Sequence, residues 1–156
     1  MSLNKTKNKM KKIIFAAICL AYTTFAGAQK STPTFKGFFE NKQYDVYLKI
    51  DFYKKNIIVP NQEILGEMAG FFGDYHDGRR WLIVDADIKP AQKELETDSV
   101  ANLSISNDYG SEDLTARFYK NTDDTYTLEQ LDGSTLKIAR NRKWVKMPKR
   151  LVFNKK

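Results

Sequence analysis

The sequence predicts an all-β protein, an antiparallel and mostly up-and-down small barrel or sandwich of about eight to ten strands. Apolar and polar residues alternate along most of the chain beyond residue 43, and Asn-, Asp- and Gly-containing turns separate the alternating runs. Alternation with a period of two is typical of half-buried strands, and such turns favour the positive φ values of tight hairpins. We therefore expect consecutive strands to pair as neighbours.

The clearest strand covers residues 44–52, "YDVYLKIDF", where every second residue from Tyr44 to Phe52 is apolar. In residues 81–88, "WLIVDADI", the alternation predicts that Val84 and Ala86 share one face and that Trp81 and Asp85 share the other. Further strands are expected at residues 57–60, 100–106, 114–119, 125–131, 135–140, 144–147 and 150–153.

Two stretches do not alternate. Residues 61–70 contain Gly66 and Gly70, which argue against a stable helix. Residues 89–98 are short and polar and indicate a loop or a single helical turn.

Residues 1–28 have the three parts of a secretory signal peptide. Five lysines without an acidic residue come first, an apolar run follows at residues 13–25, and the small residues Ala26-Gly27-Ala28 end the segment. The run is shorter than the roughly 20 apolar residues that span a bilayer, so no membrane span is expected. Cys19 is not placed for lipidation. We expect an exported protein, periplasmic or extracellular, with one domain at residues 29–156.

Removing this leader changes the charge and the cysteine content. The whole chain has 26 basic and 19 acidic residues, and without the five leader lysines 21 basic residues remain, a net charge of +2. A near-neutral domain does not favour nucleic acid as a partner. The single cysteine also leaves with the leader, so the mature domain has no disulfide, cysteine nucleophile or thiolate metal ligand.

The remaining charge is unevenly distributed. Residues 29–132 carry a net charge of −7, whereas residues 133–156 hold nine basic residues and no acidic one. Such a block indicates either a patch for an anionic partner or opposite charges that pair across neighbouring strands.

A cluster of polar residues interrupts the alternation in "SISNDYGSEDLTARF", residues 104–118. Its carboxylates are hard ligands, but their spacing does not match a known calcium loop. We interpret the cluster as a hairpin tip with Gly110 in the left-handed conformation. The alternative is a loop that contacts a partner. The candidate partner-contact residues are Asp108, Tyr109, Glu112 and Asp113 here, and Trp144 and Lys146 in the basic C-terminal segment.

The segment "GEMAGFFGDY", residues 66–75, interleaves glycines with methionine and aromatic residues. Glycines in a strand mark bulges, bends or close approaches, and the segment is either a bent strand or the rim of a ligand cavity. The candidate ligand-binding residues are Leu65, Met68, Phe71, Phe72 and Trp81.

Catalytic residues, metal ligands and cofactors are not assigned. Asp85 and Asp87 lie two residues apart on one strand, a spacing that glycoside hydrolysis allows, yet nothing else in the sequence indicates a cleft. His76 is the only histidine and lies among turn residues, a poor place to hold a catalytic base.

Two short motifs resemble those of the lipocalin family. Gly37-Phe38-Phe39 is similar to the early G-x-W of that family, with Phe39 in place of tryptophan, and Asn107-Asp108-Tyr109 is similar to its T-D-Y. The resemblance implies a small secreted barrel with a cavity for an apolar ligand. The helix that follows the family's barrel is missing here, because strands continue to the C-terminus.

The favoured hypothesis is therefore a non-enzymatic binding protein of a bacterial cell envelope with a small apolar ligand. The alternative is a protein-recognition module, such as an envelope inhibitor or immunity protein, that acts through residues 74–80, residues 108–113 and the basic tail. The least favoured is a small hydrolase that uses Asp85 and Asp87. The oligomeric state is left open.

Overall fold

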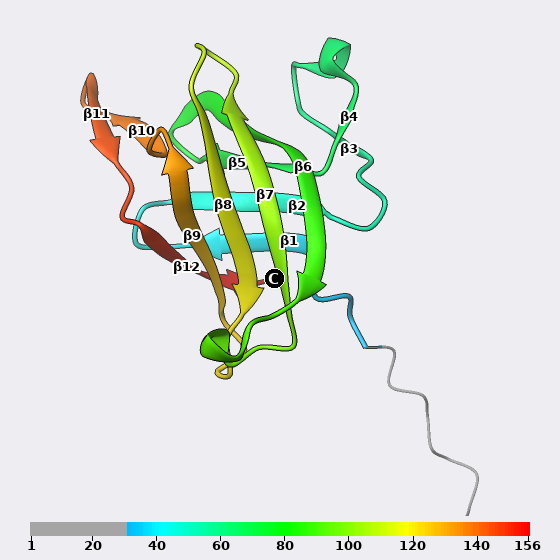
Figure 1. Cartoon of the computed structure of the whole chain (residues 1–156). Helices are drawn as coiled ribbons and strands as arrows, with labels where there is room; N and C mark the ends of the chain where they lie inside the picture. The colour runs from blue at the N-terminus through cyan, green and yellow to red at the C-terminus, as the bar shows by residue number, and fades with distance from the viewer. Residues whose placement is uncertain (1–30) are drawn as a thin grey trace, which may run out of the picture. The chain divides into compact units, whose positions relative to one another are not determined.

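The structure is a computed structural model that describes residues 31–156, so the expected leader lies outside the described residues. Eight antiparallel strands form a closed barrel (Figure 1). The prediction of an all-β, antiparallel fold is confirmed, and the structure identifies it as a barrel. The barrel strands are β1 (Lys36–Asn41), β2 (Val46–Asp51), β5 (Gly70–Asp74), β6 (Asp77–Pro90), β7 (Ser99–Asn107), β8 (Asp113–Lys120), β9 (Tyr126–Gly133) and β12 (Arg150–Lys155).

The barrel strands follow one another around the barrel in sequence order. Each strand pairs with the next, and β12 returns to β1, where Phe39 lies opposite Lys155. The predicted up-and-down order is confirmed.

Two hairpins leave this series. Strand β3 (Ile57–Ile58) pairs only with β4 (Glu67–Met68), and β10 (Lys137–Arg140) pairs only with β11 (Lys143–Lys146). The strands expected at 135–140 and 144–147 thus exist, but they lie outside the barrel. Two short 3-10 turns, η1 (Glu63–Leu65) and η2 (Lys93–Leu95), occupy the two stretches without alternation.

Aromatic side chains fill much of the barrel interior. The ring centroid of Phe118 lies 5.3 to 6.5 Å from those of five other aromatic residues, all of them buried. These five are Phe35, Phe39, Phe52, Tyr126 and Phe153. They come from both ends of the chain and from β9, so ring packing joins the strands across the barrel.

A β-bulge between Ile83 and Asp85 changes which residues of strand β6 point into the core. Trp81 and Ile83 point into the core, the bulged Val84 is exposed, and Ala86 points inward again. The prediction that Trp81 shares a face with Asp85 is therefore wrong. One extra residue in a strand reverses the alternation, which a uniform period of two does not anticipate.

A second apolar cluster lies outside the barrel, where Val59 packs with Phe71 and Leu82. Tyr47, Ile57 and Met68 border this cluster. A Cβ atom on Gly73 would lie only 2.3 Å from the Tyr47 ring, so glycine allows this ring to lie against β5. Gly73 of the 66–75 segment thus permits the close approach of a side chain.

No helix among residues 31–156 has the length and the apolar character needed to cross a membrane.

Candidate functional site

The up-and-down order brings three predicted contact segments to one end of the barrel. The β1–β2, β5–β6 and β7–β8 turns all lie there, together with the long connection from β9 to β12. That connection contains the β10–β11 hairpin (Figure 1). We call this end the β10–β11 end.

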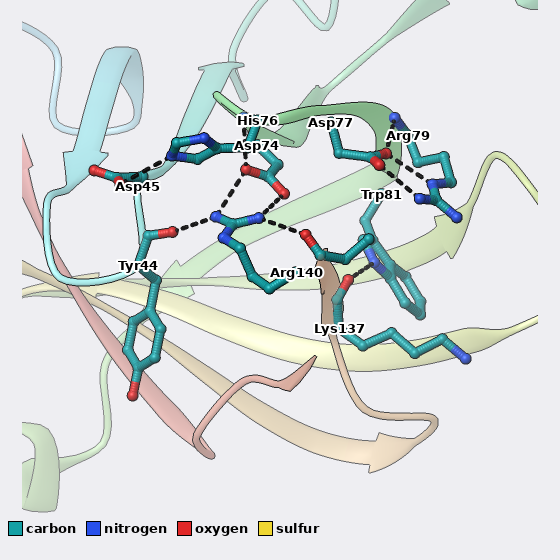
Figure 2. A network of polar contacts seen from close by, with 10 residues as sticks. Tyr44, Asp45, Asp74, His76, Asp77, Arg79, Trp81, Lys137 and Arg140 are labelled. Atoms are coloured by element: carbon teal, nitrogen blue, oxygen red, sulfur yellow. Dashed lines mark hydrogen bonds and ion pairs between the residues drawn. The ribbon is translucent and has the colours of Figure 1, made fainter. Parts of the chain in front are cut away.

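An ion pair between Arg140 and the buried Asp74 fixes the β10–β11 hairpin to the barrel. Arg140 on β10 donates hydrogen bonds of 2.5 and 2.9 Å to the two carboxylate oxygens of Asp74, whose side chain is only 3% exposed. The same guanidinium donates to the backbone carbonyl of Tyr44 over 2.8 Å. Figure 2 shows Arg140 between the β1–β2 turn and the β5–β6 turn. A guanidinium that binds both oxygens of a carboxylate fixes the orientation of the two side chains as well as stabilising their contact.

Two further groups anchor the hairpin at its base. The buried Gln130 on β9 accepts a hydrogen bond from the Leu136 amide and donates one to the Pro148 carbonyl. The indole Nε1 of Trp81 donates to the carbonyl of Lys137 over 3.2 Å (Figure 2). The hairpin is thus held before, within and after its two strands.

An aromatic stack links the hairpin to the β7–β8 turn. The rings of Tyr109 and Trp144 lie nearly parallel, with centroids 5.2 Å apart, and Tyr109 meets Trp81 edge to face. The Arg79 guanidinium lies 4.6 Å and the Lys137 ammonium 5.0 Å from the Trp144 ring centroid, within cation–π range. Trp144 nevertheless remains 45% exposed.

The β7–β8 tip is the predicted hairpin, closed by side chains. The Asn107 amide donates to Glu112, and its oxygen accepts a hydrogen bond from the Glu112 backbone. Asp108 accepts hydrogen bonds from the Arg80 backbone and from the Gln62 side chain. Gly110 does not have a positive φ, so that prediction is wrong. The side chain of Asn107 closes the turn without a left-handed residue.

Local charges and burial shift the pKa values of Asp77 and Tyr109 at this end. Hydrogen bonding to Arg79 lowers the pKa of Asp77 to about 2, which keeps the Asp77–Arg79 pair ionised (Figure 2). Burial raises the pKa of Tyr109 to about 12, so its phenol stays neutral. Asp77 therefore stays ionised and Tyr109 stays neutral near neutral pH.

The basic C-terminal residues divide into two groups. Four of the nine pair with acidic residues of the preceding part of the chain, namely Lys137 with Glu112, Arg140 with Asp74, Arg150 with Glu129 and Lys156 with Glu40. Lys155 instead donates to the Pro33 carbonyl. Within the described part of the chain, the remaining four form no ion pair: Arg142, Lys143, Lys146 and Lys149. Pairing across neighbouring strands thus applies to Arg150 and Lys156, and a patch for an anionic partner stays a prediction.

The six candidate partner-contact residues all lie at the β10–β11 end. Tyr109 and Trp144 form the stack, and Glu112 binds Lys137 beside it. Asp108 lies within the β7–β8 tip, the exposed Asp113 begins β8, and the exposed Lys146 ends β11.

The candidate ligand-binding residues fall in three separate places. Phe72 and Trp81 belong to the barrel core, whereas Phe71 and Met68 belong to the outer cluster. Leu65 lies in η1 and is 46% exposed. A hollow of about 500 Å³ is lined by other residues, among them Val84, Ser104, Ser106, Asp113, Thr115 and Asp132.

The carboxylates suggested for hydrolysis are exposed and paired with lysines. Asp85 contacts Lys55 at 2.7 Å, and Asp87 contacts Lys89 at 3.0 Å. The hydrogen bond from Lys55 lowers the pKa of Asp85, whereas a general acid requires a raised one. His76 contacts Asp45 at 3.0 Å in an exposed position (Figure 2). Among residues 31–156, no three His, Cys, Asp or Glu side chains group as metal ligands.

Sequence analysis did not identify Arg140, Asp74 or Gln130 as residues that shape this end. In residues 125–131, Gln130 occupies a position that the alternation with Tyr126 and Leu128 assigns to the inward face. A polar residue at an inward position needs hydrogen-bond partners, and this was the signal in the sequence. Asp74 and Arg140 carry no local signal, because their pairing depends on the path of the hairpin.

The fold and this site define the class as a closed, up-and-down, eight-stranded β-barrel with a hairpin fixed over one end. Comparisons of the chain with protein-family models, with curated proteins and with solved structures found no match.

Proposed function

We propose that the protein is an exported, non-enzymatic recognition module that binds a protein partner through the β10–β11 end of its barrel. The observation that carries this proposal is the position of the exposed Trp144, stacked on Tyr109 in a hairpin that Asp74 and Gln130 hold in place. Aromatic and arginine side chains are enriched at protein interfaces. A surface held in its binding geometry loses little conformational entropy on association.

Binding of an apolar ligand inside the barrel has less support. The five residues suggested for it lie in the core, in the outer cluster and in η1, and therefore do not line one common cavity. The lipocalin-like motifs support a small barrel, but they do not identify any residue that would bind a ligand.

Export is part of the proposal and rests on residues 1–28. The lysine-rich start, the apolar run and the Ala26-Gly27-Ala28 end support cleavage before Gln29. We expect N-terminal sequencing of the protein isolated from a bacterial envelope to begin at Gln29. A protein that retains Met1 in the cytoplasm would contradict this part.

Site-specific photocrosslinking tests the recognition surface. A photoreactive amino acid replaces Lys143 on β11 in one variant and Lys93, at the opposite end, in the other; both lysines are exposed. In the cells that produce the protein, we expect a discrete protein adduct from position 143 and none from position 93. Adducts from neither position, or equal adducts from both, would refute the proposal.

A further inference from the structure

Strand β11 has a free edge. The two turn residues that precede it, Asn141 and Arg142, have φ values of 50° and 63°, which define a two-residue hairpin turn. Beyond the turn, Arg140 lies opposite Lys143 and Ile138 opposite Val145. Strand β11 pairs with β10 and with no other strand among residues 31–156.

Residue pairs along this hairpin alternate between hydrogen-bonded and non-bonded, and this alternation determines which backbone groups point away from β10. The Met147 amide donates to the Leu136 carbonyl over 2.8 Å, so these two residues form a hydrogen-bonded pair. Antiparallel ladders alternate between bonded and non-bonded pairs, which makes Val145 a bonded residue. The N–H and C=O groups of Trp144 and Lys146 therefore point away from β10, and within the described part of the chain they form no hydrogen bond.

The side chains along this edge are exposed and have one sign of charge. Trp144 is 45% and Val145 37% exposed, between Lys143 and Lys146. These two lysines belong to the group without an acidic partner in residues 31–156, whereas four other basic residues of the tail do have one.

We propose that β11 binds an extended acidic segment of the partner protein by strand addition. This inference rests on the proposed function and names the partner chemistry of the same surface. The outward N–H and C=O groups of Trp144 and Lys146 supply the main-chain hydrogen bonds, as in other strand-addition complexes. Figure 1 shows β11 on the outer side of β10, where an added strand extends the two-stranded sheet.

Charge complementarity selects this occupant over a second copy of the chain. A second β11 strand carries the same two lysines and no acidic residue, so it offers no counter-charge to Lys143 or Lys146 in any register. Directly opposed like charges destabilise a sheet, whereas opposite charges stabilise it. The order of β11 therefore fits a partner segment with the pattern acid–apolar–apolar–acid, which reads the same in both directions.

A pair of variants separates backbone recognition from charge. Lys146→Pro and Lys146→Ala both remove one positive charge, but only proline removes the outward N–H. The β10–β11 ladder does not use this N–H, so both variants keep the hairpin. The probes are the capped peptide Gly-Glu-Val-Tyr-Glu-Gly and the control Gly-Val-Glu-Glu-Tyr-Gly, which has the same composition in a different order.

We expect the first peptide to bind Lys146→Pro about tenfold more weakly than Lys146→Ala, because a main-chain hydrogen bond is lost. In the wild-type protein, saturating peptide should slow hydrogen exchange of the Trp144 and Lys146 amides by about tenfold or more, while the Val145 amide, already bonded to β10, does not change. The control peptide should bind measurably more weakly.

Equal affinity of Lys146→Pro and Lys146→Ala for the first peptide would overturn strand addition. Unchanged hydrogen exchange at the Trp144 and Lys146 amides in saturating peptide would also overturn it. Equal binding of both peptides, or binding of an acidic polysaccharide to both variants alike, would overturn it in favour of charge alone. These results leave the proposed function intact if crosslinking at position 143 succeeds. Failure of that crosslink refutes the proposed function independently.

Discussion

Arg140 and Asp74 lie 66 residues apart in the sequence and meet in a bidentate ion pair that joins the β10–β11 hairpin to the β5–β6 turn. The Asp74 side chain is nearly fully buried, whereas that of Arg140 is 27% exposed. The pair therefore fixes the position of the hairpin, and removing one partner leaves a buried charge without its counter-ion.

We expect Arg140→Ala to lower the free energy of unfolding by about 3 kcal/mol, because Asp74 stays buried without a partner. The double variant Asp74→Asn/Arg140→Ala should lose less than the sum of the losses of Asp74→Asn and Arg140→Ala. Urea denaturation of the four proteins measures this coupling. Additive losses would contradict the role assigned to the pair.

Gln130→Leu should release the base of the hairpin. The substitution leaves the Leu136 amide and the Pro148 carbonyl without their hydrogen bonds, a cost of about 2 kcal/mol. Hydrogen exchange should accelerate at the Leu136 amide more than in the barrel strands. Asp132→Asn, at the exposed end of the same strand, serves as the control and should leave that rate unchanged.

The two tryptophans should differ in fluorescence. Trp81 is 1% exposed and Trp144 is 45% exposed. With Trp144→Phe, the remaining emission should have a short wavelength maximum and resist acrylamide quenching. With Trp81→Phe, the emission from Trp144 should be quenched readily. The same quenching in both variants would contradict the placement of the hairpin.

Acid should destabilise the protein in part through Glu129. Burial opposes ionisation of this carboxyl, but hydrogen bonds and charges from Arg117 and Arg150 outweigh burial and lower its pKa below 4.5. A lowered pKa in the folded state stabilises the protein above pH 4.5, and this contribution is lost as the pH falls through the folded-state pKa.

Glu129→Gln should therefore be less stable than the wild type at pH 7, and the difference should shrink as the pH falls below 4.5. Denaturation at a series of pH values measures it. Glu94→Gln is the matched control, because Glu94 is exposed in η2 and joins no ion pair among residues 31–156. A pH-independent difference for Glu129→Gln would refute the assignment.

The sequence predicted the barrel strands because their alternation is local. The strand at residues 44–52 and the hairpin at residues 104–118 needed only a period of two and turn-forming residues. The closed arrangement was not predictable from this pattern, because barrels and sandwiches share it.

The candidate site was predicted in parts. Tyr109 and Trp144 stood out as aromatic residues among charges, but their stacking depends on where the 134–149 connection folds. The bulge after Ile83 and the pairing of Asp74 with Arg140 also depend on tertiary contacts, which no local pattern encodes. The sequence therefore indicated which segments carry the site but not how they meet.

The seam between β1 and β12 has a consequence for synthesis of the protein. Phe39 on the first barrel strand pairs with Lys155 on β12, the barrel strand that is synthesised after the other seven. Contacts so distant along the chain close late and slow folding. A nascent polypeptide of this sequence therefore lacks a closed barrel until β12 has been synthesised, which leaves the preceding strands open to chaperones.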